Sequence, residues 1–472
     1  VTISGARTGT VGGAVPYGGI VLSLERLNKI KSISRETMTA VVEPGVILSD
    51  FQKAVEAEGL FYPPDPTEWS CQIGGTVATN ASGARSFKYG ATREFVKRLK
   101  IILADGDLLA IERGDSFADE SGRLTLSSAS GREIVVTLPT YERPDVRKNV
   151  SGYFCTPGMD AIDLFIGSEG TLGAITEVEL SLDSKPEGFF SGIVFFERNE
   201  NLLSFVEEVR QTSFDNRRRL NRGFEDFGYS DPTTPGCAVL TDVDARSSKV
   251  FDASLVEYFD DRALSFISEK FPETPAGMAG AIFFEQETTP GNEDRLLEQW
   301  NRLLEKHAAD LEKSWFTTAE RDREKMRGFR HALPVAVNER VVRNKQKKIG
   351  TDMAVPDANF SGFLHFYKQW LDANGLDYVI FGHIGDCHLH ANLLPKNDVE
   401  AEHARHLYGR FIAQAMMLGG TVSAEHGIGK LKSKYLHVMM GERYLNEMAE
   451  VKRVFDPKGI LGRGNMIAER FL

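Results

Sequence analysis

Three histidines and one aspartate lie within eight residues, from His383 to His390 in the stretch FGHIGDCHLHANLL (381–394). The chain has 10 histidines, and all of them lie at or after His307, so the first 306 residues have none. An imidazole can bind a metal ion through a neutral ring nitrogen, and it can exchange a proton near neutral pH. The local concentration of histidine therefore indicates a site of chemistry in the C-terminal part of the chain.

A β-hairpin would bring these histidines together. The runs DYVIFGHI and CHLHANLL both have the pattern of strands, and Gly385-Asp386 between them suits a two-residue type II′ turn. In that hairpin His383 pairs with His388. Because side chains alternate along a strand, His388, His390 and Asn392 then share one face. Hydrogen-bonded or solvent-facing histidines are the alternative, but three converging rings favour a divalent metal, since a protonated ring would repel its neighbours.

A further metal donor stands in GGTVSAEHGIGK (419–430), where Glu425 and His426 are adjacent. A lone Glu-His pair is ordinary surface in most proteins. Here the pair lies between an apolar strand and a glycine turn, which is typical of a loop that carries a site. We therefore expect Glu425 to contribute an anionic oxygen to the same site.

Three glycine-rich stretches occur earlier: SGARTGTVGGAVP (4–16), PPDPTEWSCQIGGTVATNASGARSFKYG (63–90) and DLFIGSEGTLGAIT (163–176). Glycine lets backbone N–H groups approach a pyrophosphate closely. The first stretch is not a Rossmann fingerprint, because its spacing is wrong and a strand rather than a helix follows it. A tight strand–strand turn would explain it alone, but three such stretches predict room for a large planar ligand.

Length and composition limit the class of protein. A chain of 472 residues exceeds a single core, so two or three domains are expected. The net charge of −11 argues against a nucleic-acid surface, and an anionic substrate would need a local cationic pocket. Cys71, Cys155, Cys237 and Cys387 form no CxxC pair, which gives no support for an iron–sulfur cluster. No apolar run reaches the length of a membrane span.

The N-terminal region alternates short apolar strands with glycine turns, as in GIVLSL, TAVVEPGV and LKIILADGDLLAI. One amphipathic helix is predicted at 49–59, with Ser49 as its N-cap. Residues 114–147 are rich in serine, glycine and charge, and they predict an inserted surface loop or hairpin. Residues 163–181 return to strand character.

From about residue 186 the pattern changes. GFFSGIVFFE and AGAIFFEQE predict strands, and NLLSFVEEVRQ predicts a helix. EDRLLEQWNRLLEKHAADLEK (293–313) predicts one long helix, because its apolar residues have helical spacing. Together these elements indicate a separate α+β domain. The tail YLNEMAEVKRVFDPKGILGRGNMI (444–467) predicts a helix followed by a Pro–Gly turn.

The stretches IGGTVATNASG and LFIGSEGTLG, in this order, form a specific pair. With them the chain resembles the flavin domain of the vanillyl-alcohol-oxidase / p-cresol-methylhydroxylase superfamily. Over its whole length it resembles the D-2-hydroxy-acid dehydrogenase branch, which includes D-lactate, D-2-hydroxyglutarate and glycolate-oxidising flavoproteins. The resemblance runs from Val1 to about Ile467, with 114–147 the least typical part. It implies that the family's flavin domain begins upstream of Val1.

The resemblance implies an α+β fold. A two-subdomain FAD-binding domain of the p-cresol-methylhydroxylase type would be joined to an α+β substrate (cap) domain with an antiparallel sheet. We expect the FAD-binding domain at 1–185 and the cap domain with the metal site at 186–442. A C-terminal segment at 443–472 would return to the FAD domain.

The resemblance also implies FAD, with its pyrophosphate on the first glycine loop and its isoalloxazine near the other two stretches. Some members of the superfamily tether flavin through histidine. Because the region before residue 307 has none, we expect dissociable FAD unless a segment upstream supplies a histidine. A cysteinyl link through Cys71 or Cys155 has no motif behind it. The expected FAD-binding residues are Gly5, Ala6, Thr8, Gly9, Thr10, Gly12, Gly13, Pro64, Asp65, Ser70, Gly74, Gly75, Ala78, Asn80, Gly83, Gly173 and Ile175.

The dehydrogenase branch carries a His-x-Gly-Asp-Gly-Asn-x-His motif and a downstream Glu-His-Gly. By this resemblance His383, His390 and Glu425 would bind the metal, with zinc as the default for a His2Glu site and manganese or iron as alternatives. His426 would be the catalytic base, and Asn392 would contact the substrate.

Two residues depart from the motif. Its second glycine and its asparagine are replaced by Cys387 and His388. His388 is therefore open to three interpretations: an extra metal ligand, a group that supports a ligand, or a substrate contact within the active site.

The segment RDREKMRGFRHALPVAVNERVVRNKQKK is strongly basic, and a solvated helix face explains most of its charges. The family places an arginine for the substrate carboxylate four residues before a Thr or Pro, and Arg330 precedes Pro334 in this way. A guanidinium can hold a carboxylate at two points. Some members carry a lysine two residues before an aspartate, where this chain has Gly350 before Asp352. Either Lys348 substitutes or the distal contact is absent, which argues against a dicarboxylate substrate.

Together with these residues, the resemblance implies FAD- and metal-dependent oxidation of a D-lactate-like D-2-hydroxy acid to the 2-oxo acid, with hydride passing to flavin N5. Electrons would leave to a quinone, an electron-transfer flavoprotein or an iron–sulfur partner protein. The rivals are a non-redox flavoenzyme of the alkyl-dihydroxyacetone-phosphate-synthase type and a flavin-binding subunit of a larger oxidase complex. The intact histidine constellation argues against both. We expect no nucleic-acid partner and a cytoplasmic location, with peripheral attachment to the inner membrane as the alternative; a homodimer is left open.

Overall fold

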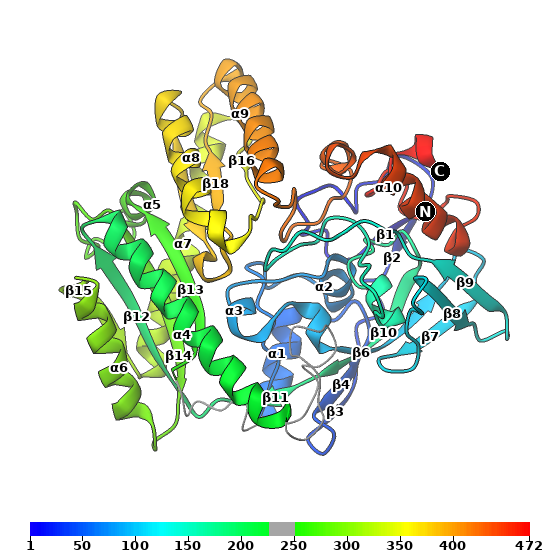
Figure 1. The fold of residues 1–472 in the computed structure, drawn as a ribbon, viewed down its shortest axis with the longest axis horizontal. Helices are drawn as coiled ribbons and strands as arrows, with labels where there is room; N and C mark the ends of the chain where they lie inside the picture. The colour runs from blue at the N-terminus through cyan, green and yellow to red at the C-terminus, as the bar shows by residue number, and fades with distance from the viewer. Residues whose placement is uncertain (226–250) are drawn as a thin grey trace.

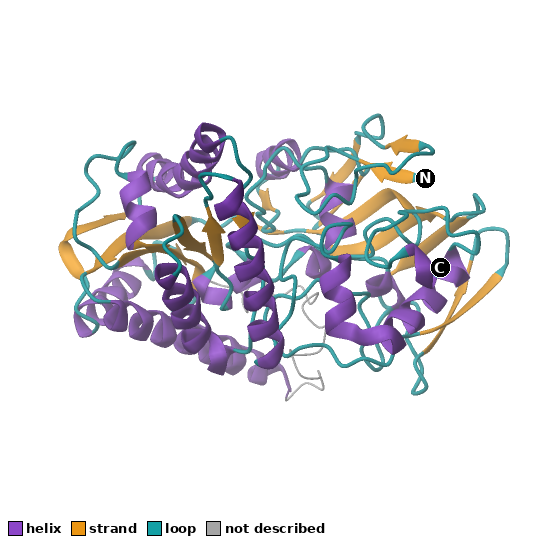
Figure 2. Ribbon diagram, turned by 90° about the horizontal axis from the view of Figure 1, so that it is seen from above, coloured by secondary structure: helices purple, strands orange, loops and turns teal. Residues whose placement is uncertain are grey.

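The computed structural model describes residues 1–225 and 251–472, so Cys237 lies outside the described residues. The described chain forms two halves that lie side by side, each built around its own β-sheet (Figures 1 and 2). Helices pack against both sheets, and the two large sheets are antiparallel throughout. This arrangement confirms the predicted α+β class.

The first half holds a five-stranded sheet of order β3-β4-β10-β6-β7. In β7, Leu109 and Ile111 are buried and their neighbours are not, as expected of a strand with one face on the core. Each of the predicted apolar runs in this region supplies a strand. The bounds are β3 (Ile30–Ser34), β4 (Thr39–Val42), β6 (Val96–Ile102), β7 (Leu108–Glu112) and β10 (Ala174–Ser181).

Helix α1 (Leu48–Ala57) buries Leu48, Phe51 and Val55 in the core, and their spacing places them on one helix face. The predicted N-cap at Ser49 is wrong, because the helix begins at Leu48 and Ile47 takes the cap position without a side-chain hydrogen bond. The backbone N–H groups of Leu48 and Ser49 instead donate to carbonyl oxygens of the loop at residues 69–71. That loop satisfies donors that a capping side chain would otherwise bind.

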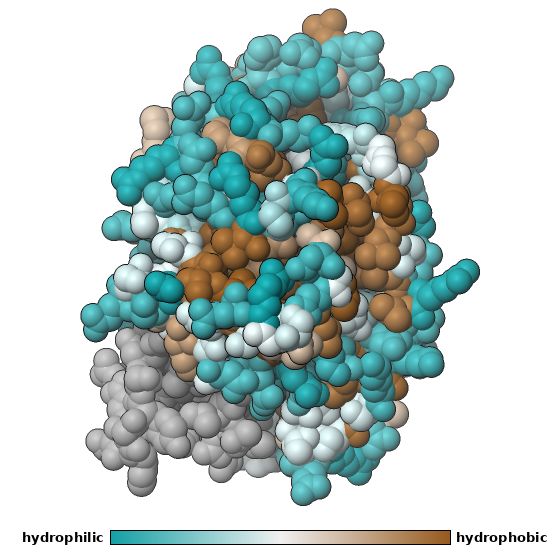
Figure 3. All heavy atoms as spheres, turned by 90° about the vertical axis from the view of Figure 1, so that its right-hand side faces the viewer, coloured by the Kyte–Doolittle hydropathy of each residue, from teal (hydrophilic) through white to brown (hydrophobic). Residues whose placement is uncertain are grey.

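Short elements frame the glycine stretches. β1 (Thr2–Ser4) and β2 (Val21–Ser23) pair around the first one, so a strand follows it, as predicted. α2 (Ile73–Thr79) and α3 (Ser86–Tyr89) lie within the second. All of β2 is exposed, and Figure 3 shows hydrophobic patches among hydrophilic side chains on the end of the molecule that carries both termini. A further short pair joins β5 (Leu60–Phe61) to β11 (Asp183–Ser184).

The segment 114–147 contains a hairpin, one of the two predicted alternatives. Its strands are β8 (Arg123–Ser127) and β9 (Glu133–Thr137). Leu124, Leu126 and Ile134 are buried in the main core, so one face of the hairpin packs against the protein. The hairpin is thus part of the first half rather than a free surface loop.

The second half is organised by a seven-stranded sheet of order β15-β12-β14-β13-β17-β18-β16. In β12, Val194 and Phe196 belong to one hydrophobic cluster and Ile193 and Phe195 to the other. Because alternate side chains point to opposite faces, both faces of the sheet are covered, which explains its continuous apolar strands. The bounds are β12 (Gly188–Phe196), β13 (Ala253–Asp260), β14 (Gly280–Thr288), β15 (Asp310–Thr317), β16 (Ile349–Gly350), β17 (Tyr378–Gly382) and β18 (His390–Leu393).

Four helices cover this sheet. Residues of α4 and α6 join the cluster on one face, and residues of α5 and α7 join the cluster on the other. The bounds are α4 (Asn199–Glu225), α5 (Asp261–Ile267), α6 (Glu293–Lys306) and α7 (Glu320–Asn344).

The single long helix predicted at 293–313 is wrong. Helix α6 ends at Lys306, and β15 starts at Asp310. Leu296, Trp300 and Leu304 keep the helical spacing of buried residues, but Ala308 has φ 51°, which turns the chain out of the helix. The following residues then pair with β12, so sheet pairing outweighs the local helical pattern of 307–313.

The C-terminal part of the chain returns to the first half. After α8 (Phe360–Ala373) and α9 (Asp398–Met417), helix α10 (Ser433–Phe455) ends before a turn at residues 456–459, as predicted. Lys452 Nζ on α10 donates to the carbonyl of Thr171 at 2.9 Å. Within the described ranges, no helix combines the length and the apolar character needed to cross a membrane.

The two halves meet through buried charges at α3. Lys88 Nζ lies 2.8 Å from Glu287 on β14, and the two side chains are only 3% and 7% exposed. Arg217 on α4 also reaches α3, where it donates to the carbonyl of Phe87, and it pairs with Asp252 at 2.6 Å. These contacts fix the relative position of the segments that contribute to the site described next.

Lys88→Met should lower the free energy of unfolding by about 3–5 kcal/mol, because Glu287 would stay buried without its cation. Lys185→Met is the matched control, since it removes an exposed pair with Glu56 at 3.1 Å and should change stability by less than about 1 kcal/mol. Denaturation of both variants beside the parent protein measures the difference. Equal midpoints for the two variants would show that the buried pair does not stabilise the junction.

Candidate active site

The three clustered histidines converge, but through a different local structure from the one predicted. Strand β17 ends at Gly382 and β18 begins at His390, with Phe381 paired to His390. The predicted register is confirmed, because the pairing of Phe381 with His390 places His383 opposite His388, and the N–H of His388 donates to the carbonyl of His383 at 3.2 Å. The predicted type II′ turn is wrong: Ile384–Asp386 form a 3-10 turn, and the positive φ lies at Cys387 rather than at Gly385. A Cβ on Gly385 would lie 2.8 Å from the ring of Phe87, so this turn packs against the first half.

The ring centroids are close in spite of that difference. His383 lies 6.0 Å from both His388 and His390, and His388 lies 4.6 Å from His390. Glu425 from the predicted site loop completes the group. Its Oε1 is 3.2 Å from His383 Nε2, and its Oε2 is 3.4 Å from His390 Nε2. The structure therefore brings together the three residues expected to bind a metal.

The hydrogen bonds of the two imidazoles leave their Nε2 atoms facing Glu425. His383 Nδ1 is 2.5 Å from Glu257 Oε1, and His390 Nδ1 is 2.8 Å from the carbonyl of Thr351. A ring that donates from Nδ1 has a lone pair on Nε2 when it is neutral. Two such lone pairs beside a carboxylate match the donor set of a His2Glu metal site. The residues present thus fit a divalent ion.

His388 is fully buried behind Glu425. Its Nε2 is 3.2 Å from Asp352 Oδ1, and its Nδ1 is 3.8 Å from Glu425 Oε2. Among the described residues, His388 forms a metal-compatible group with Asp352 and Glu425, and none that also includes His383 or His390. Burial lowers the pKa of His388 to about 4, which keeps the ring neutral. This position favours a supporting role over direct binding beside His390.

Asp352 anchors the loop that carries Glu425 and His426. Its carboxylate accepts hydrogen bonds from the backbone N–H groups of Glu425 at 3.0 Å and His426 at 2.5 Å. Lys432 Nζ lies 2.6 Å away and supplies the balancing charge. The sequence analysis used Asp352 only as a landmark for position 350 and missed this role, because the contact with the loop at 425–426 joins residues far apart in the sequence.

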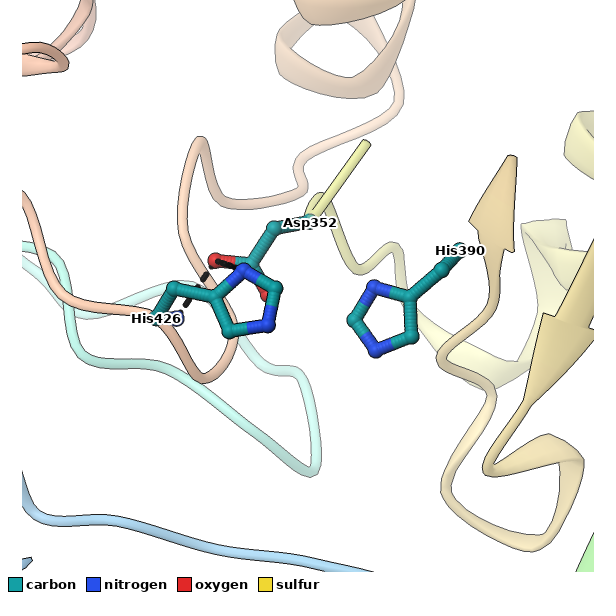
Figure 4. Close-up of side chains that lie close together, drawn as sticks. All are labelled: Asp352, His390 and His426. Carbon is teal, nitrogen blue, oxygen red and sulfur yellow. Dashed lines mark hydrogen bonds and ion pairs between the residues drawn. The ribbon is translucent and has the colours of Figure 1, made fainter. Parts of the chain in front are cut away.

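His426 lies beside His390 with its ring nearly parallel, at 5.0 Å and 11°, and its Nδ1 is 3.5 Å from Asp352 Oδ2 (Figure 4). Its side chain is 37% exposed, so solvent or a ligand can reach it. Burial of the rest of the ring lowers the pKa of His426, against the attraction of Asp352, and a neutral ring can accept a proton.

Arg330 is buried on α7 and lies close to His383, because both side chains bind Glu257. Its Nε donates to Glu257 Oε2 at 2.8 Å, and within the described ranges its two terminal nitrogens have no hydrogen-bond partner. Glu257 is a second residue that the sequence analysis missed; the available signal was one acidic residue inside the apolar strand ASLVEYFD.

The remaining predicted substrate residues lie on β18 and its neighbour. Asn392 is buried two positions beyond His390, and its amide donates to the carbonyl of His390 at 3.4 Å. Gly350 pairs with Asn392, and a Cβ there would lie 3.1 Å from Asn392 Oδ1. Lys348 is exposed. Position 350 therefore has no side chain that could bind the second carboxylate of a dicarboxylate substrate.

The first glycine loop has the features of an anion cradle. Among the residues that the structure describes, none accepts a hydrogen bond from a backbone N–H group between Gly5 and Gly13. A Cβ on Gly9 or Gly75 would meet no atom within 4 Å, so both positions face open space. Free N–H groups in such a loop bind phosphate oxygens well. The loop thus fits the pyrophosphate of FAD.

The other predicted FAD residues lie in the second and third glycine-rich stretches, at 63–90 and 163–176. Gly83 is pressed against Asp65, where a Cβ would lie 1.8 Å from the carbonyl oxygen, and Gly74 against Pro44 at 2.4 Å. Asn80 ends α2 with φ 47°. Pro64 and Ser70 lie between β5 and α2, Ala78 in α2, and Gly173 and Ile175 at the start of β10.

The first two glycine-rich stretches, at 4–16 and 63–90, lie directly against the histidine cluster and the loop that carries Glu425. Ser82 Oγ donates to Glu425 Oε1 at 3.1 Å. Lys148 Nζ donates both to Glu425 Oε1 at 2.6 Å and to the carbonyl of Gly83 at 2.8 Å. Val11 in the first glycine loop accepts from the backbone of Lys430 at 3.0 Å. Lys148 was also missed, since one lysine in a charged segment gives no signal of burial.

Comparisons with known proteins agree with this geometry. A family profile described as a FAD binding domain matches residues 1–112, and one described as FAD linked oxidases, C-terminal domain, matches residues 238–466. The chain is 30% identical over 478 residues to D-lactate dehydrogenase of Anaerostipes hadrus, covering 99% of this chain and 84% of that protein. It is 28% identical over 476 residues to glycolate oxidase subunit GlcD of Bacillus subtilis (strain 168), covering 98% and 83%.

Solved structures share the fold. p-Cresol methylhydroxylase with bound substrate has a TM-score of 0.65 at 15% identity, covering 100% of this chain and 85% of that one. Alkyldihydroxyacetonephosphate synthase has a TM-score of 0.60 at 15% identity, covering 98% and 72%. The two solved structures show the fold that this chain shares with p-cresol methylhydroxylase. Since the two profiles lie in both halves of the structure and relatives that are 30% identical span nearly the whole chain, this protein belongs to the FAD-linked oxidases, in the family of the D-lactate and D-2-hydroxyglutarate dehydrogenases.

Proposed function

We propose that this protein oxidises a small D-2-hydroxy acid to the 2-oxo acid with FAD and a divalent metal. One observation carries the proposal: His383, His390, Glu425 and His426 lie together beside the glycine-rich stretch at 63–90, and Arg330 is linked to them through Glu257. Relatives named D-lactate dehydrogenase, D-2-hydroxyglutarate dehydrogenase and glycolate oxidase subunit GlcD support the substrate class.

The residues listed above around the glycine loops would hold FAD. Bound FAD would supply the acceptor for two electrons and for the hydrogen on C2 of the substrate. No histidine lies in this part of the chain, so we propose that FAD dissociates on denaturation.

His383, His390 and Glu425 would hold the metal, with zinc as the default ion and manganese or iron as alternatives. A divalent ion at these three ligands would polarise the substrate hydroxyl and lower its pKa. Three protein ligands leave a coordination position for substrate, as in catalytic rather than structural sites.

The protein's own groups would then orient the substrate and move one proton. The terminal nitrogens of Arg330 would hold the carboxylate at two points, which fixes C2 and its hydroxyl relative to the cluster. His426 would accept the hydroxyl proton at a ring nitrogen. Asn392 would contact the substrate, and His388 would support Glu425. Loss of this proton, together with the C2 hydrogen and its electron pair, balances oxidation to the 2-oxo acid.

The glycine at position 350 favours a substrate with one carboxylate, because it offers no cation beside Asn392, the proposed substrate contact. The domain limits 1–185, 186–442 and 443–472 stay predictions. So do the electron acceptor (a quinone, an electron-transfer flavoprotein or an iron–sulfur partner protein), the oligomeric state and a cytoplasmic location.

Anaerobic addition of substrate provides the direct test. D-Lactate and other small D-2-hydroxy acids should bleach the absorbance of bound FAD, whereas their L enantiomers should not. We expect D-2-hydroxyglutarate to react much less well than D-lactate, since Gly350 offers no distal cation. If no 2-hydroxy acid of either hand bleaches the flavin, the redox assignment fails and a non-redox flavoenzyme takes its place.

Removing the metal should separate the two cofactors. A chelator should abolish turnover while FAD absorbance stays with the protein, and His390→Ala should lose zinc and activity together.

His426→Ala should keep zinc but lower kcat by about 10²–10⁴-fold if His426 is the base. His403→Ala, which changes an exposed residue on α9, is the control and should behave like the parent. Full activity in chelator, with no metal found by elemental analysis, would contradict the metal assignment.

Arg330 is best tested by lysine, because a neutral residue would leave buried Glu257 without its cation. Arg330→Lys keeps the charge but loses the two-point grip, so the apparent affinity for substrate should fall by about 1.5–3 kcal/mol. Arg340→Lys lies on the same helix at a partly exposed pair with Asp377, and it should leave KM unchanged. An unchanged KM in Arg330→Lys would mean that another cation holds the carboxylate.

A further inference from the structure

Glu257 is a buried carboxylate that binds two proposed active-site residues at once. It is 3% exposed on β13. Its Oε1 lies 2.5 Å from His383 Nδ1, and its Oε2 lies 2.8 Å from Arg330 Nε. No other carboxylate in the described part of the chain touches both of these residues.

The fold determines this bridge. β13 and β17 are antiparallel with Tyr258 opposite Gly382, so continuation of the register places Glu257 opposite His383. Phe259 shares a face of β13 with Glu257, and its ring contacts Phe329 of α7 at 5.5 Å. Arg330 follows Phe329 directly. The packing of Phe329 on Phe259 therefore brings Arg330 to Glu257, and the strand register brings His383 to the same carboxylate.

Each bond has a chemical consequence for the proposed site. With Oε1 accepting from His383 Nδ1, the Nε2 lone pair of His383 faces the metal position, and the carboxylate makes that nitrogen a stronger donor. With Oε2 accepting from Arg330 Nε, the guanidinium is fixed and its two terminal nitrogens stay available for a substrate carboxylate. Glu257 also supplies the negative charge that balances the buried guanidinium of Arg330.

The permanent cation of Arg330 lies against the Glu257 carboxylate, with Arg330 Nε 2.8 Å from Oε2. An ionised carboxylate has two acceptor oxygens, so one side chain can bind the N–H groups of both Arg330 and His383.

We propose that Glu257 is a positioning residue that orients the metal ligand His383 and the carboxylate-binding Arg330 together, so that one side chain sets both metal affinity and substrate affinity. This inference rests on the proposed function for the roles of its two partners. It adds a residue that touches neither substrate nor metal.

Glu257→Gln gives a sharp test, because a glutamine side chain has one acceptor oxygen for two donors. We expect zinc affinity to fall about 10–100-fold, measured by competition with a chromogenic chelator on FAD-loaded protein without substrate. We also expect KM for the best hydroxy acid to rise at least several-fold. Glu257→Asp keeps two acceptor oxygens and should recover part of both losses.

Asp260→Asn is the matched control. Asp260 is a fully buried carboxylate on the same strand, where it caps α5 through the N–H of Ala263 at 2.7 Å and accepts from Ile380 at 3.0 Å. Its loss should lower the unfolding temperature but leave zinc affinity and KM unchanged. Equal losses of zinc affinity in Asp260→Asn and Glu257→Gln would reduce Glu257 to a structural role and overturn the proposal.

The two proposals fail in different ways. If no hydroxy acid bleaches the parent flavin, the proposed reaction fails, while chelator competition still compares zinc binding in the parent, Glu257→Gln and Asp260→Asn. If the parent is active and Glu257→Gln binds zinc and substrate as the parent does, the bridge has no positioning role even though the reaction stands.

Discussion

The geometry of the candidate site depends on the hydrogen bonds that the buried carboxylate of Asp352 accepts. It accepts hydrogen bonds from the backbone of Glu425 and His426 and from the hydroxyl of Ser423 at 2.8 Å, and it pairs with Lys432. A fully buried charge is tolerated only when its partners are all in place, because desolvation costs several kcal/mol for each ion. The site loop therefore has one strongly preferred conformation, and that conformation points Glu425 toward the histidines.

The same loop is held from the other half of the molecule. Both oxygens of Glu169 accept from the loop backbone, at 2.6 Å from Ile428 and 2.6 Å from Gly429, while Ser82 and Lys148 bind Glu425. The loop that carries Glu425 is thus held from both halves: Asp352 follows β16 of the second sheet, and Ser82, Lys148 and Glu169 belong to the glycine-rich half. The junction between the two sheets is thus both a structural contact and the place where the chemistry is assembled.

Sequence patterns predicted the parts of this arrangement that have a local signal. Apolar runs predicted several strands of both sheets, and the crowded histidines predicted convergence, although a 3-10 turn packed on Phe87 replaced the expected type II′ turn. The helix predicted through residue 313 failed because pairing with β12 overrides local spacing. Asp352, Glu257 and Lys148 could not be predicted, since each is a single charged residue whose burial depends on contacts far away in sequence.

Those three residues and four further charged side chains form one linked group at the site. Four mutually linked carboxylates (Glu257, Asp352, Asp386 and Glu425) face three cations (Lys148, Arg330 and Lys432), which leaves one negative charge. Without a metal, His383 offsets that charge: burial lowers its pKa, but Glu257 and Glu425 prevail and raise it to about 9. A divalent ion held by His383, His390 and Glu425 would take the place of this proton, because a metal-binding imidazole is neutral. The buried carboxylates at this junction therefore require either the proton or a cation at the same place, since an unbalanced buried charge is costly.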